Sequence, residues 1–127
     1  MRNLLLLLFG IVVGAIAAAN IINTLRQRDA YPRGLMDVMQ HHYGALRDAA
    51  KGGRCGDGMT RDFAVLRQLS DEIATAVYAS DTPDAPFREY DQRLHDALAS
   101  TPANCAEASP ALDRIGAACD ACHRQYR

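Results

Sequence analysis

The stretch that decides the fold is SPALDRIGAACDACHRQYR, which runs from Ser109 to Arg127. Ser109 is the expected N-cap of a helix, and Pro110 follows at the first helical position, where proline is well tolerated. Apolar side chains then recur at the spacing of one helical face: Leu112, Ile115, Cys119, Cys122 and Tyr126. This period predicts an amphipathic helix whose inward face carries both cysteines.

Three earlier stretches repeat the 3.6-residue period, and no segment after residue 26 shows the alternation of a β-strand. We expect these helices at about residues 29–50, 60–79 and 85–100, with Asp29 and Thr60 as the N-caps of the first two. Their apolar faces comprise Leu35, Met36, Met39, Tyr43, Leu46 and Ala50, then Phe63, Leu66, Leu69, Ile73 and Val77, then Phe87, Tyr90, Leu94 and Leu98.

Short segments rich in glycine or proline separate the four stretches, as in KGGRCGDG and SDTPDAP. Four amphipathic helices with short connections predict an all-α fold. Short connections favour antiparallel neighbours, so we expect an up-down-up-down four-helix bundle over residues 26–127.

The first 25 residues have the pattern of a targeting segment. Arg2 is followed by an apolar run from Leu4 to Ala19, and the chain carries no further charge before Arg26. The run is slightly long for a signal peptide and slightly short for a full membrane span. An uncleaved signal anchor is narrowly favoured, and a signal peptide cleaved before Asn20 is the alternative. Either one predicts an exported domain, with an N-terminal hydrophobic helix if the segment is retained.

Composition narrows the class of protein. The chain has 127 residues and a formal net charge of −1 at pH 7, so it has no nucleic-acid footprint, which would be strongly basic. A domain of about 100 residues buries only a modest core, so a disulfide or a bound cofactor would add to its stability. The four cysteines fit that need in an exported chain.

The last helix contains the run C-x-x-C-H, from Cys119 to His123, which is the usual attachment signature of a c-type haem. On a helix, Cys119 and Cys122 are neighbours, and His123 lies one turn after Cys119. Both thiols can therefore add to the vinyl groups of one haem edge while the imidazole binds iron. We expect one covalent haem c near the C-terminal end of this helix.

Three other readings of the motif remain. A C-x-x-C redox pair needs a thioredoxin-like βαβ context, and the pattern contains no strands. A four-cysteine zinc site is formally available, but Cys55 and Cys105 lack the paired short spacing of such sites. The third reading is a chance occurrence.

The run Cys119, Cys122, His123, Tyr126, Arg127 at the end of the last helix resembles the cytochrome c-prime family, the class II cytochromes c. The segment YPRGLMDVMQHHYGAL resembles that family's first helix. The resemblance covers essentially the whole exported part. It implies a periplasmic haem protein that transfers electrons or binds small gases. Family members often form homodimers through their first two helices, so a homodimer is one form to expect.

The resemblance also suggests haem contacts for two arginines. A basic residue early in the first helix commonly lies near the haem propionates, but that position holds Pro32 here and Arg33 is next to it. Arg127 matches the terminal arginine, which the resemblance places near the proximal histidine. The alternative for Arg127 is a solvated arginine at the helix end.

Met36 is the candidate for the second axial ligand. With about 1.5 Å rise per residue, His123 lies about 6 Å before the end of its helix and Met36 about 7.5 Å after the start of the first. The family alignment also puts Met36 where a low-spin subgroup carries a methionine ligand. The alternative is a core methionine that fills space. We interpret His42 as a residue at the helix seam, and His41 and His95 as surface or rim residues.

Cys55 and Cys105 fall in the first and third connections, which lie at the same end of an up-down-up-down bundle. We expect a structural disulfide between them. Closing a loop of this length would stabilise the folded state by about 4 kcal/mol. Two free thiols are the alternative.

Two functions follow. The first is electron transfer by a periplasmic cytochrome c, either soluble or tethered to the inner membrane, with His123 and Met36 as iron ligands and a redox protein as partner. The second is a five-coordinate haem protein in which Leu35, Met36, Met39 and Tyr43 wall a pocket for nitric oxide or carbon monoxide. No cluster of an acid, a base and a nucleophile is visible, so we do not expect an enzyme.

Overall fold

The computed structural model describes the backbone of residues 2–79 and 81–126, and the side-chain surroundings of residues 7–24, 30–79 and 81–126. The chain divides into two compact units, Met1–Arg33 and Gly34–Arg127. This division falls after Arg33, later than residue 25, where the sequence placed the end of the targeting segment.

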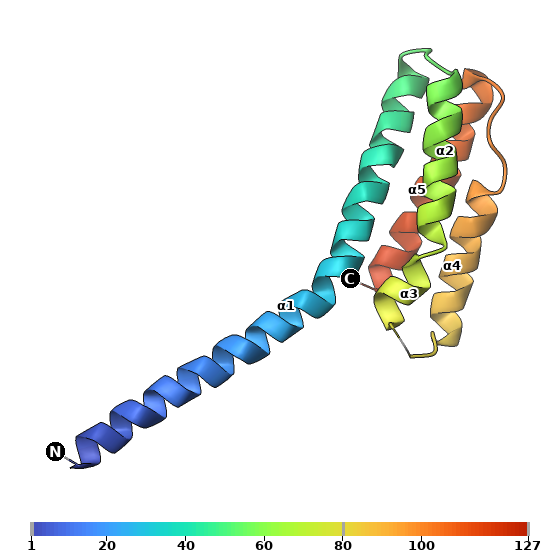
Figure 1. Ribbon diagram of the computed structural model, residues 1–127. Coiled ribbons are helices and arrows are strands. Elements are labelled where there is room, and N and C mark those ends of the chain that lie inside the picture. The colour runs from blue at the N-terminus through green and yellow to red at the C-terminus, as the bar shows by residue number, and fades with distance from the viewer. Residues whose placement is uncertain (1, 80, 127) are drawn as a thin grey trace. The chain divides into compact units, whose positions relative to one another are not determined.

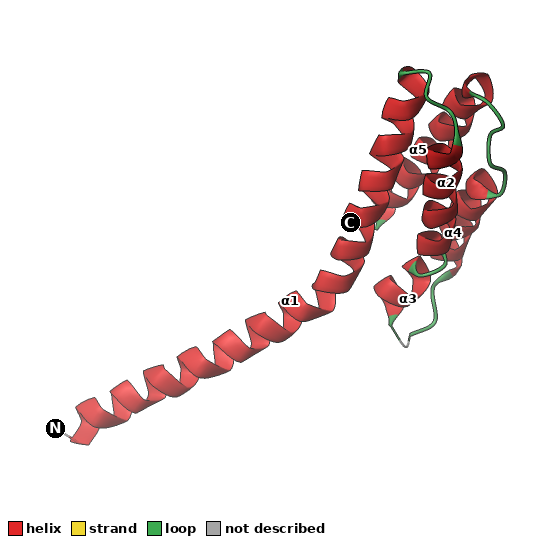
Figure 2. Ribbon diagram, turned by 45° about the horizontal axis from the view of Figure 1, so that its top comes forward, coloured by secondary structure: helices red, strands yellow, loops and turns green. Residues whose placement is uncertain are grey.

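All regular structure in the described residues is helical, so the all-α prediction is confirmed (Figures 1 and 2). The elements are α1 (Arg2–Lys51), α2 (Asp57–Ser70), α3 (Ile73–Tyr78), α4 (Ala85–Leu98) and α5 (Cys105–Gln125). Within the unit Gly34–Arg127, α4 packs against both α2 and α5.

The N-terminal unit consists of the first part of α1. Its stretch Leu7–Thr24 is long and apolar enough to cross a membrane, and none of it is buried inside the protein. A signal sequence near an N-terminus has the same properties. The predicted helix start at Asp29 is wrong, because α1 continues through it from Arg2. Leucine and alanine are strong helix formers, so the apolar segment extends the helix up to and past Pro32.

The predicted helix over residues 60–79 is two helices. α2 begins at Asp57 rather than at Thr60, and a turn at Asp71 and Glu72 separates it from α3. Just before the turn, the buried Ser70 hydroxyl donates to the carbonyl oxygen of Arg67 at 2.7 Å. Such a local bond competes with helix continuation. The turn resets the helical phase, which leaves Val77, a predicted core residue, 42% exposed.

The start of α5 also differs from its predicted place. Asn104, not Ser109, is the N-cap, and its side-chain oxygen accepts from the backbone N–H of Glu107 at 3.1 Å. The Glu107 carboxylate in turn accepts from the N–H of Ala103 at 3.1 Å, which completes a reciprocal cap. Pro110 therefore lies inside the helix rather than at its first position.

The apolar faces of all five helices meet in one core within the unit Gly34–Arg127. Its buried members are Leu35, Met39, Leu46, Met59, Phe63, Leu66, Ile73, Ala76, Phe87, Leu94, Leu98, Ala108, Leu112, Ile115 and Ala118. This core accounts for most of the predicted apolar stripes, and burial of apolar area is the main force that stabilises such a domain.

A disulfide joins Cys55, in the connection between α1 and α2, to Cys105, the first residue of α5. Their Cα atoms are 5.4 Å apart and 50 positions apart in sequence. The bond links the C-terminal end of α1 to the N-terminal end of α5.

Candidate functional site

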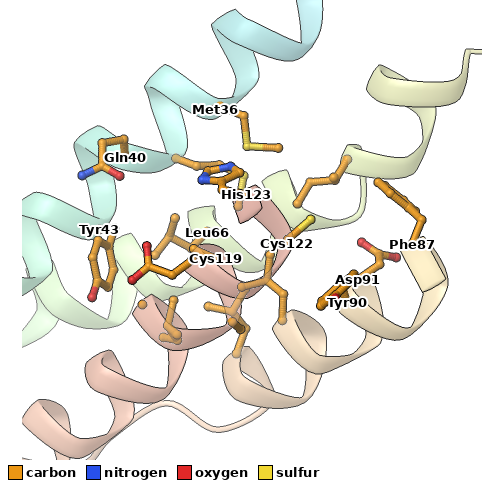
Figure 3. Close-up of a pocket in the computed structure, with 18 of the residues that line it drawn as sticks. Met36, Gln40, Tyr43, Leu66, Phe87, Tyr90, Asp91, Cys119, Cys122 and His123 are labelled. Atoms are coloured by element: carbon orange, nitrogen blue, oxygen red, sulfur yellow. The ribbon is translucent and has the colours of Figure 1, made fainter. Parts of the chain in front are cut away.

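A cavity of about 250 Å³ opens in the core of the unit Gly34–Arg127. Every helix of the unit contributes to its wall, and Figure 3 draws most of the lining residues. The side chains on which the argument depends are Met36, Met39, Tyr43, Tyr90, Asp91, Cys119, Cys122 and His123.

One wall carries the C-x-x-C-H residues of α5. Cys119 and Cys122 are free thiols, both partly buried, and His123 lies in the last turn of the helix. Burial raises the pKa of Cys119, with a smaller contribution from the Asp120 carboxylate. Burial also raises the pKa of Cys122, and Asp91 adds to that effect. Both groups are therefore neutral thiols at pH 7 and are less easily oxidised than thiolates.

The facing wall comes from α1. Met36 is half-buried and Met39 is 7% exposed, and both line the cavity. Figure 3 labels Met36 on α1 and His123 on α5 among the residues that line this cavity. The predicted pair of axial residues, Met36 and His123, thus lines one cavity from two helices.

Tyr43 closes the cavity farther along α1. Its hydroxyl donates to the carbonyl oxygen of Leu112 in α5 at 3.1 Å, and the Arg47 guanidinium lies 5.8 Å from its ring centre. Burial raises the pKa of Tyr43, so its hydroxyl remains a donor. A Cβ on Gly116 would collide with the Tyr43 hydroxyl, so a larger residue at that position would have to displace the end of the Tyr43 side chain.

Tyr126, the tyrosine that follows the motif, is held by a carboxylate that the sequence reading did not single out. Its hydroxyl donates to Asp84 Oδ1 at 2.7 Å, and the Tyr78 hydroxyl donates to Asp84 Oδ2 at 3.0 Å. Asp84 is also the N-cap of α4, where it accepts from the N–H of Phe87 at 2.8 Å. These bonds, that of Tyr126 first, lower the pKa of Asp84.

Asp91 is the second residue that the sequence reading missed. It lies on the cavity wall in α4, and its Oδ1 atom is buried without a hydrogen-bond partner in the described part of the chain. Its Oδ2 atom is 3.7 Å from His95 Nε2. Burial raises the pKa of Asp91. An apolar stripe gives no signal for a polar residue beside it, so helical period alone could not have found this group.

The remaining predicted site residues lie elsewhere. Arg33 is exposed, and it is the last residue of the N-terminal unit rather than part of the unit that contains the cavity. Arg127 lies outside the described residues. His42 lies at a helix seam, where its Nδ1 atom is 3.1 Å from Asp62 Oδ1 of α2. His95 is partly exposed on α4, with 28% of its side chain accessible.

The structure also bears on the zinc alternative. Two of the four cysteines are bonded to each other, so a four-cysteine site is not formed. Over residues 7–24, 30–79 and 81–126, no group of three or more His, Cys, Asp and Glu side chains is arranged to hold a metal ion. A haem iron needs only two protein ligands, so such a group is not required of it.

Comparisons with family models, with curated proteins and with solved structures found no match to this chain.

Proposed function

We propose that this chain is a c-type cytochrome that transfers single electrons in the periplasm. In this proposal Cys119 and Cys122 would hold one haem c covalently, and His123 and Met36 would bind its iron. The observation that carries it is the convergence of two free thiols, an imidazole and a thioether on one cavity. The resemblance of the C-terminal run to cytochromes c-prime points the same way.

The residues present fit a haem c. Two free, neutral thiols three positions apart on one helix match the two vinyl groups of a porphyrin edge. The other walls are mainly apolar, from Met39, Leu66, Phe87 and Leu94, as a macrocycle face requires. The chemistry that the bound haem would supply is reversible one-electron exchange at its iron.

The protein's own residues would then tune and protect that exchange. A thioether from Met36 opposite His123 favours ferrous iron and raises the potential. Met39 and Tyr43 would exclude water from the Met36 side, and the Tyr126–Asp84 bond would fix the end of α5 that bears His123.

We further infer the antiparallel up-down-up-down arrangement for α1, α2 with α3, α4 and α5. Its support is the disulfide, because an alternating path brings the first and third connections to the same end. Short connections between the helices also favour antiparallel neighbours.

The location is part of the proposal. The apolar stretch Leu7–Thr24 would direct export and then remain as an inner-membrane anchor, or be removed as a signal peptide. A disulfide between Cys55 and Cys105 suits the oxidising periplasm.

Absorption spectra of protein expressed with haem-attachment machinery test the function. We expect a haem that survives acid–acetone extraction and is low-spin in both oxidation states. Met36→Leu should convert it to high-spin iron, and Met39→Leu, on the same helix and the same cavity, should leave it low-spin. Cys119→Ser with Cys122→Ser should abolish covalent retention.

Each other outcome has a definite meaning. A wild-type protein that is high-spin and unchanged by Met36→Leu contradicts the electron-carrier scheme. Carbon monoxide or nitric oxide bound by such a protein would favour the gas-binding alternative. A protein that retains no haem under these conditions contradicts both.

A further inference from the structure

The Asp91 carboxylate occupies an unusual position for an acidic side chain. It lines an otherwise mainly apolar cavity, its side chain is 23% exposed, and its Oδ1 atom is buried without a partner. A carboxylate in such a place is costly in its charged form, and protonation removes that cost. The structure therefore keeps a group next to the motif that is ready to accept a proton.

A chain of polar groups leads from Asp91 to the surface. His95 Nε2 is 3.7 Å from Asp91 Oδ2, and His95 Nδ1 is 3.7 Å from Asp71 Oδ1. The exposed fraction rises along this chain, from 23% for Asp91 to 28% for His95 and 67% for Asp71. The His95 imidazole thus lies within ion-pair distance both of Asp91 and of a side chain that is mostly exposed to solvent.

The charged and titratable groups that act on Asp91 come from three elements. His95 lies on its own helix α4, and its electrostatic interaction with Asp91 lowers the pKa of that carboxyl. Asp71, in the turn after α2, raises that pKa. Cys122 of α5 interacts with Asp91 electrostatically, and it ceases to titrate once it is alkylated.

We propose that Asp91 binds one proton when one electron enters the haem, so that this cytochrome transfers both together; this inference rests on the proposed function. The electron would come from a reduced partner protein, and the bound haem would supply the iron that accepts it. One proton from solvent forms an O–H bond on Asp91. No other bond forms or breaks, and the net charge around the cavity is unchanged.

The physical reason is charge compensation. Cys122 would carry a thioether bond, so Asp91 would lie beside the macrocycle edge. An added electron makes a second negative charge nearby more costly, which favours the neutral acid. Reduction should therefore become harder as the pH rises through the range in which Asp91 loses its proton.

Potentiometric titration of the haem-loaded protein at several pH values tests this. At a fixed ambient potential, the ratio of reduced to oxidised haem should fall by up to about tenfold for each pH unit in that range. Asp91→Asn should remove this dependence, and its potential should match the low-pH limit of the wild type. Asp96→Asn, the same change on an exposed residue of α4, should behave as the wild type.

Infrared spectra provide a second readout. A reduced-minus-oxidised difference spectrum of the wild type should contain the C=O band of a newly protonated carboxylic acid, and Asp91→Asn should lack it. His95→Gln should shift the pH range upward, because loss of the imidazolium raises the pKa of Asp91. This variant keeps the test open should Asp91→Asn fail to fold.

Two results would overturn the inference while leaving the proposed function intact. One is a covalent low-spin haem whose potential does not vary with pH. The other is a pH dependence that persists in Asp91→Asn, which would assign it to another group. A protein without covalent haem would overturn the inference together with the proposed function.

Discussion

Gly116 and Tyr43 pack closely on the cavity wall. The Tyr43 hydroxyl lies within collision distance of a Cβ on Gly116 and donates to the carbonyl oxygen of Leu112. A tyrosine from α1 thus bonds to the backbone of α5 beside a position that carries no side chain. This contact adds to the shared apolar core in joining the two walls of the cavity.

Gly116→Ala should therefore lower the free energy of unfolding by about 1–3 kcal/mol, because the new methyl group forces Tyr43 out of its place. Urea unfolding followed by circular dichroism measures this. Gly44→Ala is the matched control, since a Cβ at Gly44 meets nothing within 4 Å. That variant should gain about 0.5–1 kcal/mol from the helix preference of alanine.

The double variant Gly116→Ala with Tyr43→Phe tests whether the loss of stability comes from a collision between the new methyl group and the Tyr43 hydroxyl. Removing the hydroxyl relieves the contact, so the second change should restore part of the lost stability. A double variant whose losses simply add would contradict the proposed contact.

Among the helices, Asp84 connects three elements. It caps α4, it accepts from Tyr78 at the end of α3, and it accepts from Tyr126 directly after α5. The rings of Phe87 and Tyr126 also meet edge to face, with centres 5.3 Å apart. The position of the last turn of α5, which holds His123, thus depends on the start of α4.

Asp84→Ala should lower the urea midpoint at pH 7. The folded state holds the pKa of Asp84 below its ordinary value of 3.8. The carboxylate therefore stabilises the fold above that value, and the gain is lost as the pH falls through the lower folded pKa. The deficit of the variant should shrink in acid.

Urea titrations of wild type and variant at neutral and acidic pH measure this effect. Asp37→Ala, which alters an exposed carboxylate within α1, should cause no such loss. A deficit of equal size at every pH would contradict a role for the charge.

The sequence predicted the buried faces of the helices better than it predicted where the helices begin and end. The apolar faces were predictable because burial on one side of a helix leaves a 3.6-residue period. The end of α2 was not, because Ser70 bonds locally and lies near His95 of another helix. The start of α5 was open to prediction, since Asn104 and Glu107 form a capping pair, but Ser109 and Pro110 were the more familiar signal.

In the candidate site, too, residues that are close in sequence could be predicted, and residues brought together by packing could not. Cys119, Cys122 and His123 are close in sequence, so their spacing alone brought them together. Asp84 and Asp91 approach the motif only through the packing of α4 against α5, which no local pattern encodes.

At the scale of the whole molecule, the disulfide lies far from the end of the cavity that His123 lines. Cys105 and His123 are both on α5, and a rise of about 1.5 Å per residue separates them by about 27 Å along its axis. The disulfide should therefore stabilise the domain without shaping the site.

Cys55→Ala with Cys105→Ala should lower the free energy of unfolding by about 4 kcal/mol, because the unfolded chain is no longer constrained. The absorption spectrum of the haem-loaded protein should stay as in the wild type. Unfolding curves and spectra of the same samples measure both effects. A folded variant with altered iron coordination would contradict the separation.

The length of α5 has a consequence for the order of events during maturation. Four cysteines allow six different single disulfides, and only the bond between Cys55 and Cys105 leaves both Cys119 and Cys122 free. Once α5 has formed, Cys105 and Cys119 are about 21 Å apart, which is beyond the reach of thiol–disulfide exchange. Bonds between Cys105 and either cysteine of the motif can therefore form only before this helix does. The helix itself keeps Cys105 apart from the two cysteines that remain free.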